Sequence, residues 1–259
     1  MSLTSHPVIF EKIGPVGVLT MQYAPHNLVG HDLCSSLLAA LERSENSGCR
    51  ALVLKSGLRH FSAGADLALF EDRGARLDAE LNPVGVLDAF SQCRLPIVAS
   101  VHGMALGGGF ELALACDFII AGASAKFGLV EVTLGLHPLM GGIQRVIDRA
   151  GEARGKEIVM LGRRHDAATL EKWGVINRVV PDAQLQESSL LIAQELANGP
   201  TVAHGATKRL ANVFLASGMH AADAAMKDIQ KPIFASTDLV RGLDAFKAAG
   251  PGNAVFEGN

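Results

Sequence analysis

The stretch Pro96-Ile-Val-Ala-Ser-Val-His-Gly-Met-Ala-Leu-Gly-Gly-Gly-Phe-Glu111 decides the fold. Its apolar start predicts a strand, its three glycines a turn, and Glu111–Cys116 a helix. Consecutive glycines suit a backbone that passes close to another group and leaves N–H groups pointing outward. A helix that begins beside them adds the positive end of its dipole. The turn therefore indicates a site for an anion or a developing oxyanion, with tight packing against other backbone as the alternative.

Strands and helices alternate on both sides of this turn. This alternation is typical of an α/β fold with crossover connections. The expected strands are Val8–Ile13 and Val18–Tyr23, which form a hairpin, then Ala51–Lys55, Phe118–Ala121 and Val175–Val180. The expected helices are Leu33–Arg43, Leu81–Phe90, Gly142–Ala150 and Glu152–Leu161.

Beyond residue 182 the pattern becomes purely helical. Three helices are expected, separated by Gly-Pro and Ser-Gly pairs, at Gln184–Asn198, Thr201–Ala216 and His220–Ile229. The sequence thus predicts two parts, an α/β core over residues 1–190 and a helical C-terminal region over residues 191–259.

The composition is that of a globular protein. Hydrophobic residues make up 49% and charged residues 19%, and 23 basic against 26 acidic residues give a net charge of −3. Without a basic excess we expect no nucleic-acid partner. The apolar stretch Leu112–Ala123 is interrupted by Asp117 and is too short to span a bilayer, so we expect no membrane association. Scattered cysteines without a CxxC pair and an N-terminus unlike a signal peptide favour a cytoplasmic location with reduced thiols.

A second loop of small residues follows the strand Ala51–Lys55. Ala63, Gly64 and Ala65 would let a ligand approach the main chain. The alternative is an ordinary loop that leads into a helix, with Asp66 as the N-cap.

Two glutamates stand out near these loops. Glu131 has apolar neighbours, so partial burial should raise its pKa towards the range useful for proton transfer. Glu111 lies in the first turn of the helix after the glycines. The alternatives are a loop acid in contact with solvent for Glu131 and a surface acid that complements the helix dipole for Glu111.

Several common catalytic motifs are absent. The chain has no GxxxxGK[ST] phosphate loop, no GxGxxG fingerprint and no GxSxG nucleophile elbow. It also has no HExxH and no clustered His/Cys set, so we expect no metal.

Four segments together resemble the crotonase superfamily, also called the enoyl-CoA hydratase/isomerase family. In order along the chain they are Phe61–Leu67, Gly103–Leu112, Phe127–Gly135 and Gly141–Arg145. The resemblance implies a crotonase-like spiral of ββα units, with a helical C-terminal region that forms homotrimers or homohexamers. It also implies an oxyanion hole, made by the N–H groups of Ala65 and Gly108, that binds a thioester carbonyl.

The resemblance also implies how coenzyme A is held. The pantetheine arm would pass the loop formed by Phe61, Ala63, Gly64 and Asp66. Arg59 and Lys247 are candidate contacts for its phosphate or adenine end, and ordinary solvated side chains are the alternative.

One segment departs from the family's pattern. Small or acidic residues usually precede the glycine pair Gly141-Gly142, whereas Leu139 and Met140 stand there in this chain. These two side chains are expected to line the acyl end of the substrate site.

Two glutamates at the positions of Glu111 and Glu131 are the pattern of the family's hydratases. The resemblance therefore implies hydration of 2-trans-enoyl-CoA to 3-hydroxyacyl-CoA, in fatty acid or related acyl-CoA metabolism, with no cofactor besides the coenzyme A of the substrate. Glu111 would orient or deprotonate the water and Glu131 would protonate C2. The alternatives are a Δ3-Δ2 enoyl-CoA isomerase, another enzyme on the same scaffold, and a non-catalytic acyl-CoA-binding relative.

Overall fold

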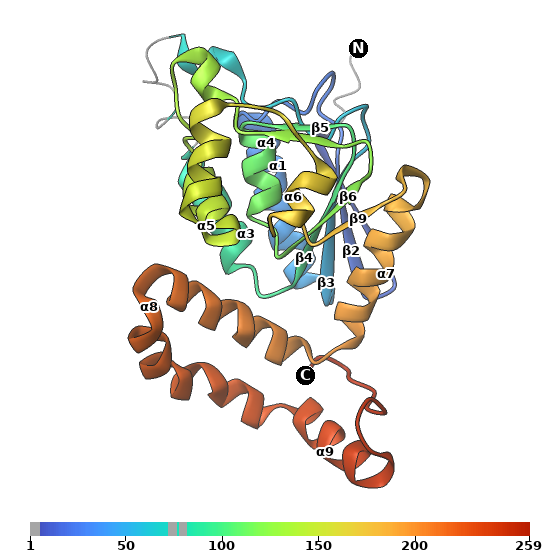
Figure 1. Ribbon diagram of the computed structural model, residues 1–259. Coiled ribbons are helices and arrows are strands. Elements are labelled where there is room, and N and C mark those ends of the chain that lie inside the picture. Colours follow the sequence, from blue (N-terminus) through green and yellow to red (C-terminus); the bar gives the residue numbers. More distant parts are fainter. Residues whose placement is uncertain (1–5, 72–76, 78–81) are drawn as a thin grey trace.

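The computed structural model describes residues 6–71, 77 and 82–259, which form an α/β core and a helical arm (Figure 1). The strands are β1 Val8–Ile13, β2 Val16–Met21, β3 Ala51–Ser56, β4 Ile97–Val101, β5 Met104–Leu106, β6 Phe118–Gly122, β7 Lys126–Gly128, β8 His165–Asp166 and β9 Arg178–Val180. The helices are α1 His31–Asn46, α3 Pro83–Gln92, α4 Gly108–Leu114, α5 Gly142–Leu161, α6 Ala167–Lys172, α7 Leu185–Asn198, α8 Thr201–Ala235 and α9 Thr237–Ala249. Short 3-10 turns are η1 Leu67–Phe70, η2 Glu131–Leu134 and η3 Asp182–Gln184.

The main sheet has six strands in the order β1-β2-β3-β4-β6-β9. The hairpin partners β1 and β2 are antiparallel, whereas β2, β3, β4, β6 and β9 run parallel to one another. A second sheet, β5-β7-β8, lies beside it. Helices follow or precede the parallel strands, as crossover connections require.

Alternate residues of the central strands face opposite layers of core. In β3, Leu52 and Leu54 join the large cluster with α1 and α3, whereas Ala51 and Val53 join a smaller cluster with α7. Figure 1 shows α7 on one face of the sheet and α1, α3, α4 and α5 on the other. Both faces are therefore covered, as expected for a parallel sheet.

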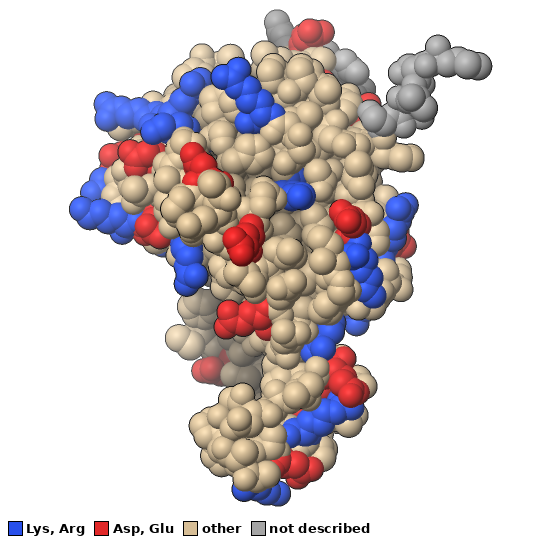
Figure 2. All heavy atoms as spheres, turned by 90° about the vertical axis from the view of Figure 1, so that its right-hand side faces the viewer, with Lys and Arg blue, Asp and Glu red and all other residues tan. Residues whose placement is uncertain are grey.

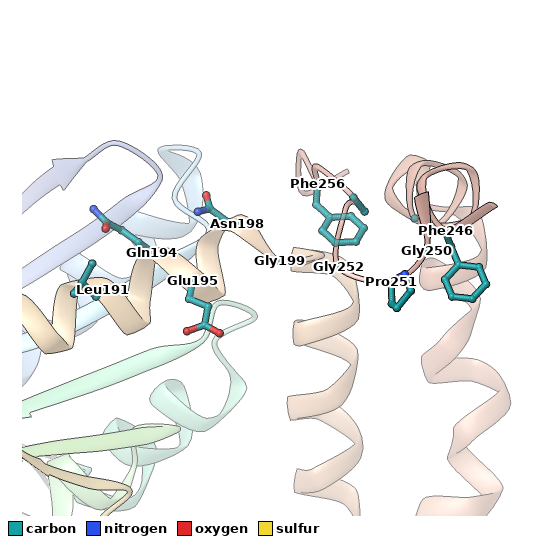
Figure 3. A pocket seen from close by; sticks show the side chains of 12 residues that line it. Leu191, Gln194, Glu195, Asn198, Gly199, Phe246, Gly250, Pro251, Gly252 and Phe256 are labelled. Atoms are coloured by element: carbon teal, nitrogen blue, oxygen red, sulfur yellow. The ribbon is translucent and has the colours of Figure 1, made fainter. Parts of the chain in front are cut away.

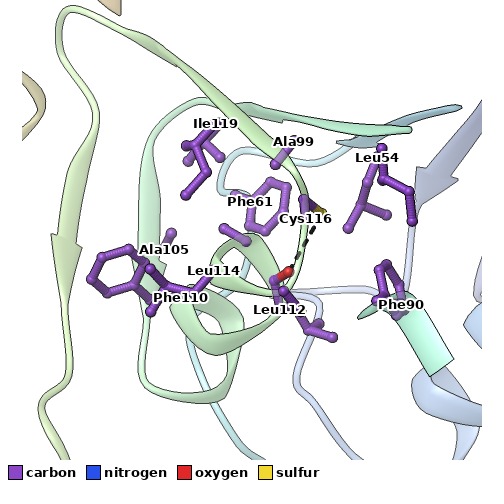
Figure 4. Packing of buried hydrophobic residues seen from close by; sticks show 14 of the residues in the cluster. Leu54, Phe61, Phe90, Ala99, Ala105, Phe110, Leu112, Leu114, Cys116 and Ile119 are labelled. Carbon is purple, nitrogen blue, oxygen red and sulfur yellow. Dashed lines mark hydrogen bonds between the residues drawn. The ribbon is translucent and has the colours of Figure 1, made fainter. Parts of the chain in front are cut away.

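The large cluster is densely aromatic around α4. Phe61 lies within it, between Phe90 and Phe110 in the view of Figure 4, and all three side chains are fully buried. The rings of Phe110 and Phe127 are tilted against each other with centroids 5.2 Å apart. This packing fixes the short helix that carries Glu111.

The arm consists of α8 and α9, which extend away from the core (Figure 1). Lys208 on α8 forms an ion pair with Asp117 at 2.8 Å and donates a hydrogen bond to the carbonyl of Leu95. Arg50 donates hydrogen bonds to the carbonyls of Gly199 and Phe256, so it joins the start of the arm to the end of the chain. Side chains of the core therefore anchor both ends of the arm.

The structure confirms the α/β core, the hairpin and the helical C-terminal region, and it refines their boundaries. The predicted break between helices at Gly218 is confirmed: α8 consists of two helical segments that meet at this glycine, whose backbone angles, φ 78° and ψ −179°, are not helical. The break predicted between Ala150 and Glu152 is confirmed as well, since Gly151 within α5 has φ of 79° and ψ of 164°. Since α7 packs on the sheet, the change from core to arm lies at Gly199-Pro200 rather than at residue 190.

Other elements were outside the predictions. Strands β5 and β7 have three residues each, too few to show an alternating pattern, and α9 follows Ser236, whose side chain caps it. The predicted helix Leu81–Phe90 corresponds to α3, and its first residue lies outside the described residues. Within the described part of the chain, no helix is long and apolar enough to cross a membrane.

The Lys208–Asp117 pair provides a test of how the arm is anchored. Replacing Lys208 with Met should leave the half-buried Asp117 without its cation and lower the free energy of unfolding by about 1–3 kcal/mol. The double variant K208M/D117N should recover most of this loss, because an Asn oxygen still accepts the N–H of Ile97. Urea unfolding measures both. The matched control is K231M, since Lys231 pairs with Asp228 on the open surface, and a loss as large as that of K208M would contradict the proposed anchor.

Candidate active site

A buried polar network joins the loops that form the site. Asn27 is fully buried with φ of 50°, and its side chain donates hydrogen bonds to Ser56 Oγ and to the carbonyl of Phe61. Ser62 Oγ donates to the carbonyl of Asn27 at 2.7 Å and accepts the N–H of Gly64 at 3.3 Å. The network therefore holds the backbone of the Ala63–Ala65 loop in one conformation.

The glycine turn packs directly against this loop. A Cβ on Gly109 would lie 2.4 Å from the Cβ of Ser62, so no larger residue fits without moving the loop. Gly107 adopts φ of 47°, and its N–H donates to the carbonyl of Gly128. Both glycines thus serve close backbone approach, and α4 begins at Gly108, three residues before the predicted start of the helix.

Two backbone N–H groups remain available for a ligand at this contact. Ala65 lies opposite Val29 in an isolated β-bridge, whose hydrogen bonds are made by the residues on either side of Ala65. The N–H of Val29 donates to the carbonyl of Gly64, and the N–H of Asp66 donates to the carbonyl of Val29. The N–H of Ala65 consequently donates to no other residue among those the structure describes. Gly108 is the first residue of α4, so no preceding turn of helix accepts its N–H.

Ala65 and Gly108 line one cavity of about 100 Å³ together with both glutamates. Most of its walls are hydrocarbon, from Leu67, Phe70, Leu77, Val130, Leu134, Leu136, Leu139 and Met140. The structure thus brings together the two predicted acids and the two predicted N–H groups. An apolar wall around a few polar groups is the usual character of a small-molecule site.

Glu111 is 2% exposed and is held rigidly. Its Oε1 accepts the N–H of Met140 at 3.0 Å and that of Gly142 at 2.7 Å. Burial raises the pKa of Glu111 to about 7, the Gly142 N–H opposes this rise, and the nearby Glu131 adds to it. The surface position considered for Glu111 is therefore excluded.

Glu131 is the first residue of η2 and is partly buried. Burial raises the pKa of its carboxyl, and the charge of His137 opposes this rise. Its Oε2 is buried and accepts no hydrogen bond from the described residues. Its Oε1 would lie 3.0 Å from a Cβ on Gly107, so this glycine also makes room for the acid. A buried carboxyl oxygen without a partner has capacity left for a substrate or water.

The other predicted contact residues divide into two groups. Ala63, Gly64, Leu139 and Met140 line the cavity. The remaining four lie outside it: Phe61 is in the core, Asp66 caps η1 by accepting the N–H of Ala68, Arg59 is exposed beside the loop, and Lys247 is exposed on α9.

Residues that sequence reasoning missed support the site from behind. Ser62 stood only inside a motif segment and Asn27 was not singled out, because a buried polar side chain inside a loop leaves no periodic signal. Leu136, from a loop, and Phe70, from the 3-10 turn η1, also line the cavity, although the sequence does not predict the course of either segment.

A second hollow of about 750 Å³ is lined by α7 on one side and by α9 and residues 250–256 on the other (Figure 3). Leu191, Glu195 and Phe246 are among its lining residues. Glu195 is the only titratable group among the described residues that line it, so it lacks the pair of acids that the smaller cavity has. No group of three or more His, Cys, Asp or Glu side chains in the described ranges could hold a metal ion.

Comparison with known proteins agrees with this geometry. Residues 11–257 match the family described as enoyl-CoA hydratase/isomerase. The chain is 34% identical to a probable enoyl-CoA hydratase of Rhizobium meliloti strain 1021, over 93% of this chain and 95% of the relative. A 163-residue segment, 62% of each chain, is 40% identical to carnitinyl-CoA dehydratase of Salmonella heidelberg. The crystal structure of an enoyl-CoA hydratase from Bacillus anthracis superposes with a TM-score of 0.89 at 28% identity, covering 98% of this chain and all of that one.

The environment of Glu111 predicts a pH dependence of stability. Because the folded state raises the pKa of Glu111 from 4.5 to about 7, the folded protein binds more protons than the unfolded chain in this range. The glutamate should therefore lower the free energy of unfolding by about 3 kcal/mol as the pH rises from about 4.5 to about 7. In E111Q the amide oxygen can still accept both N–H groups, and this part of the decline should vanish. Urea unfolding between pH 4.5 and 8 measures the difference, with the exposed Glu152 as E152Q control; an unchanged slope in E111Q would exclude a raised pKa.

Proposed function

Since this chain belongs to the enoyl-CoA hydratase/isomerase family, we propose that it adds water reversibly to the double bond of a 2-trans-enoyl-CoA thioester. Membership confirms the resemblance and the crotonase-type fold expected from the sequence, and makes this a crotonase-type acyl-CoA enzyme. The product of the proposed reaction is a 3-hydroxyacyl-CoA.

The observation that carries the proposal is the pair of acids in one cavity. Glu111 and Glu131 both line it, and burial raises the pKa of each. The charge of Glu131 raises the pKa of Glu111 further, so the pair favours a state that shares one proton. A site with one base and one acid near neutral pH suits addition of water, which needs both.

In the proposed mechanism the thioester carbonyl accepts hydrogen bonds from the N–H groups of Ala65 and Gly108. These donors stabilise negative charge on the oxygen, typically by about 3–4 kcal/mol per donor. The water oxygen bonds to C3 while Glu111 takes one of its protons, and the π electrons shift to make an enolate. C2 of the enolate then takes a proton from Glu131. Proton exchange between the carboxyls and solvent restores the starting state.

Dehydration is the same chemistry in reverse. One segment is 40% identical to carnitinyl-CoA dehydratase, which by its name removes water. This similarity supports a water-adding or water-removing reaction over isomerisation. For the coenzyme A end, Arg59 beside the small-residue loop is the proposed phosphate contact. Lys247 is exposed on α9, which Figure 1 shows at the far end of the molecule from α4, so we propose that it contacts substrate bound to a neighbouring copy.

Single replacements of the two acids test the reaction. E111Q and E131Q should each lower kcat for hydration of crotonyl-CoA by about 10²- to 10⁴-fold. Each substitution removes one proton-transferring carboxyl and keeps the size and shape of the side chain. Loss of the absorbance of the conjugated thioester measures the rate. E152Q is the matched control, since Glu152 is exposed on α5.

The same assays separate the alternatives. Full activity of E111Q on a 3-enoyl-CoA, with activity abolished in E131Q, would favour isomerase chemistry with one base. Tight binding of acyl-CoA without hydration, isomerisation or hydrolysis of a panel of thioesters would contradict the enzyme proposal and favour a non-catalytic relative.

We further propose that the chain forms a homotrimer or homohexamer through its arm. Large apolar side chains are exposed along the arm, with exposed fractions of 65% for Met219, 68% for Phe234 and 60% for Phe246. Exposed apolar surface of this extent on extended helices favours association with another protein surface.

Figure 2 shows acidic and basic side chains intermixed over one face of the core, in keeping with the proposal that the chain has no nucleic-acid partner. The four cysteines are buried free thiols, in keeping with the proposed cytoplasmic location.

Phe234 tests this assembly. F234E should shift the molar mass measured by light scattering from three or six times the 27.2 kDa of one chain towards that of a single chain, because a charge in an apolar interface loses its water. The control is L161E, because Leu161 is an exposed leucine on α5, outside the arm. A single-chain mass for the unmodified protein would contradict the proposal.

A further inference from the structure

Met140 occupies a special position in the cavity. Its backbone N–H binds Glu111 Oε1, and its side chain is 4% exposed. Its Sδ lies 3.3 Å from the place that a Cβ on Gly108 would take. Met140 therefore lies against both the segment that carries the proposed base and the residue that carries one proposed oxyanion donor.

The space beside Met140 is small. The cavity measures about 100 Å³, whereas pockets for ordinary small ligands measure roughly 300–1,000 Å³. A long acyl chain would need Met140 or its neighbour Leu139 to move.

The walls also select for hydrocarbon. The described residues that line the cavity contribute only two charged side chains, Glu111 and Glu131, and both have roles in the proposed reaction. A polar acyl end would lose its water there without a hydrogen-bond partner. A trimethylammonium end is favoured by several aromatic faces, and Phe70 is the single aromatic side chain among the described lining residues.

We propose that Leu139 and Met140 close the acyl end of the site and restrict the enzyme to 2-enoyl thioesters with short, unbranched hydrocarbon chains. This proposal rests on the proposed hydratase function. Met140 sets the length because it is buried and fixed by its own backbone hydrogen bond, and Leu139, which is partly buried, forms the adjoining wall.

The test is the kcat/KM of hydration for 2-enoyl-CoA thioesters of four, six, eight and ten carbons. For the unmodified enzyme we expect a fall of at least about 10-fold for each added two-carbon unit beyond six, since one methylene in a tight pocket changes kcat/KM about 10- to 200-fold. M140A should raise the value for the ten-carbon substrate at least about 10-fold relative to the four-carbon one, L139A should do so to a smaller extent, and M140L should keep the short-chain preference. M160A is the matched control, because Met160 is 65% exposed on α5.

The outcomes separate this proposal from the one beneath it. Equal kcat/KM for four and ten carbons in the unmodified enzyme would overturn the length limit and leave the hydratase function standing. A higher kcat/KM for an enoyl-CoA with a trimethylammonium end than for the four-carbon substrate would overturn the hydrocarbon limit. Activity with none of the thioesters would reject the hydratase function itself. The unmodified enzyme alone decides these outcomes, so they hold even where M140A fails to fold.

Discussion

The site depends on the contact between Ser62 and Gly109. A Cβ on Gly109 would come within 2.4 Å of the Ser62 side chain, so the small-residue loop and the glycine turn touch through backbone. Asn27 and Gly64 fix Ser62 from the other side. The two N–H groups proposed for the oxyanion hole come from separate segments, and this contact sets their relative position before any substrate binds. Such preorganisation is what makes hydrogen-bond donors effective in catalysis.

The two acids share a cavity but are held in different ways. Glu111 has two backbone donors on one oxygen and is almost inaccessible, whereas Glu131 has a buried oxygen without a donor. A carboxylate fixed by two N–H groups keeps one orientation, which suits a base that must aim at a single water. A carboxyl with a vacant oxygen can carry a proton and deliver it to carbon. The hydrogen bonds therefore distinguish the two acids, and they leave an oxygen of Glu131 open to a substrate or water.

How much the sequence predicts differs between the parts of the molecule. The strands of the main sheet and the glycine turn were predictable because local pattern and packing agree there. The burial of Glu111 was not, because an acid in the first turn of a helix is equally compatible with a surface position. Phe61 was expected beside the substrate and lies in the core, since a motif gives the course of the backbone and not the direction of each side chain. The helix breaks at Gly151 and Gly218 were predictable, because glycine leaves the helical conformation most readily and both residues adopt non-helical backbone angles. Long-range contacts such as that of Ser62 with Gly109 have no signal in one sequence.

Met140 links the chemistry to the choice of substrate. Its backbone N–H holds Glu111, and any residue except proline can supply that group. Its side chain forms the wall of the acyl cavity, so the residue type can change there while the hydrogen bond to the base stays. Sequence variation at this position consequently alters the shape of the pocket at little cost to the reaction. The same reasoning explains why a departure from the family's pattern can occur so close to a catalytic group, since only the backbone of this loop is fixed by the chemistry.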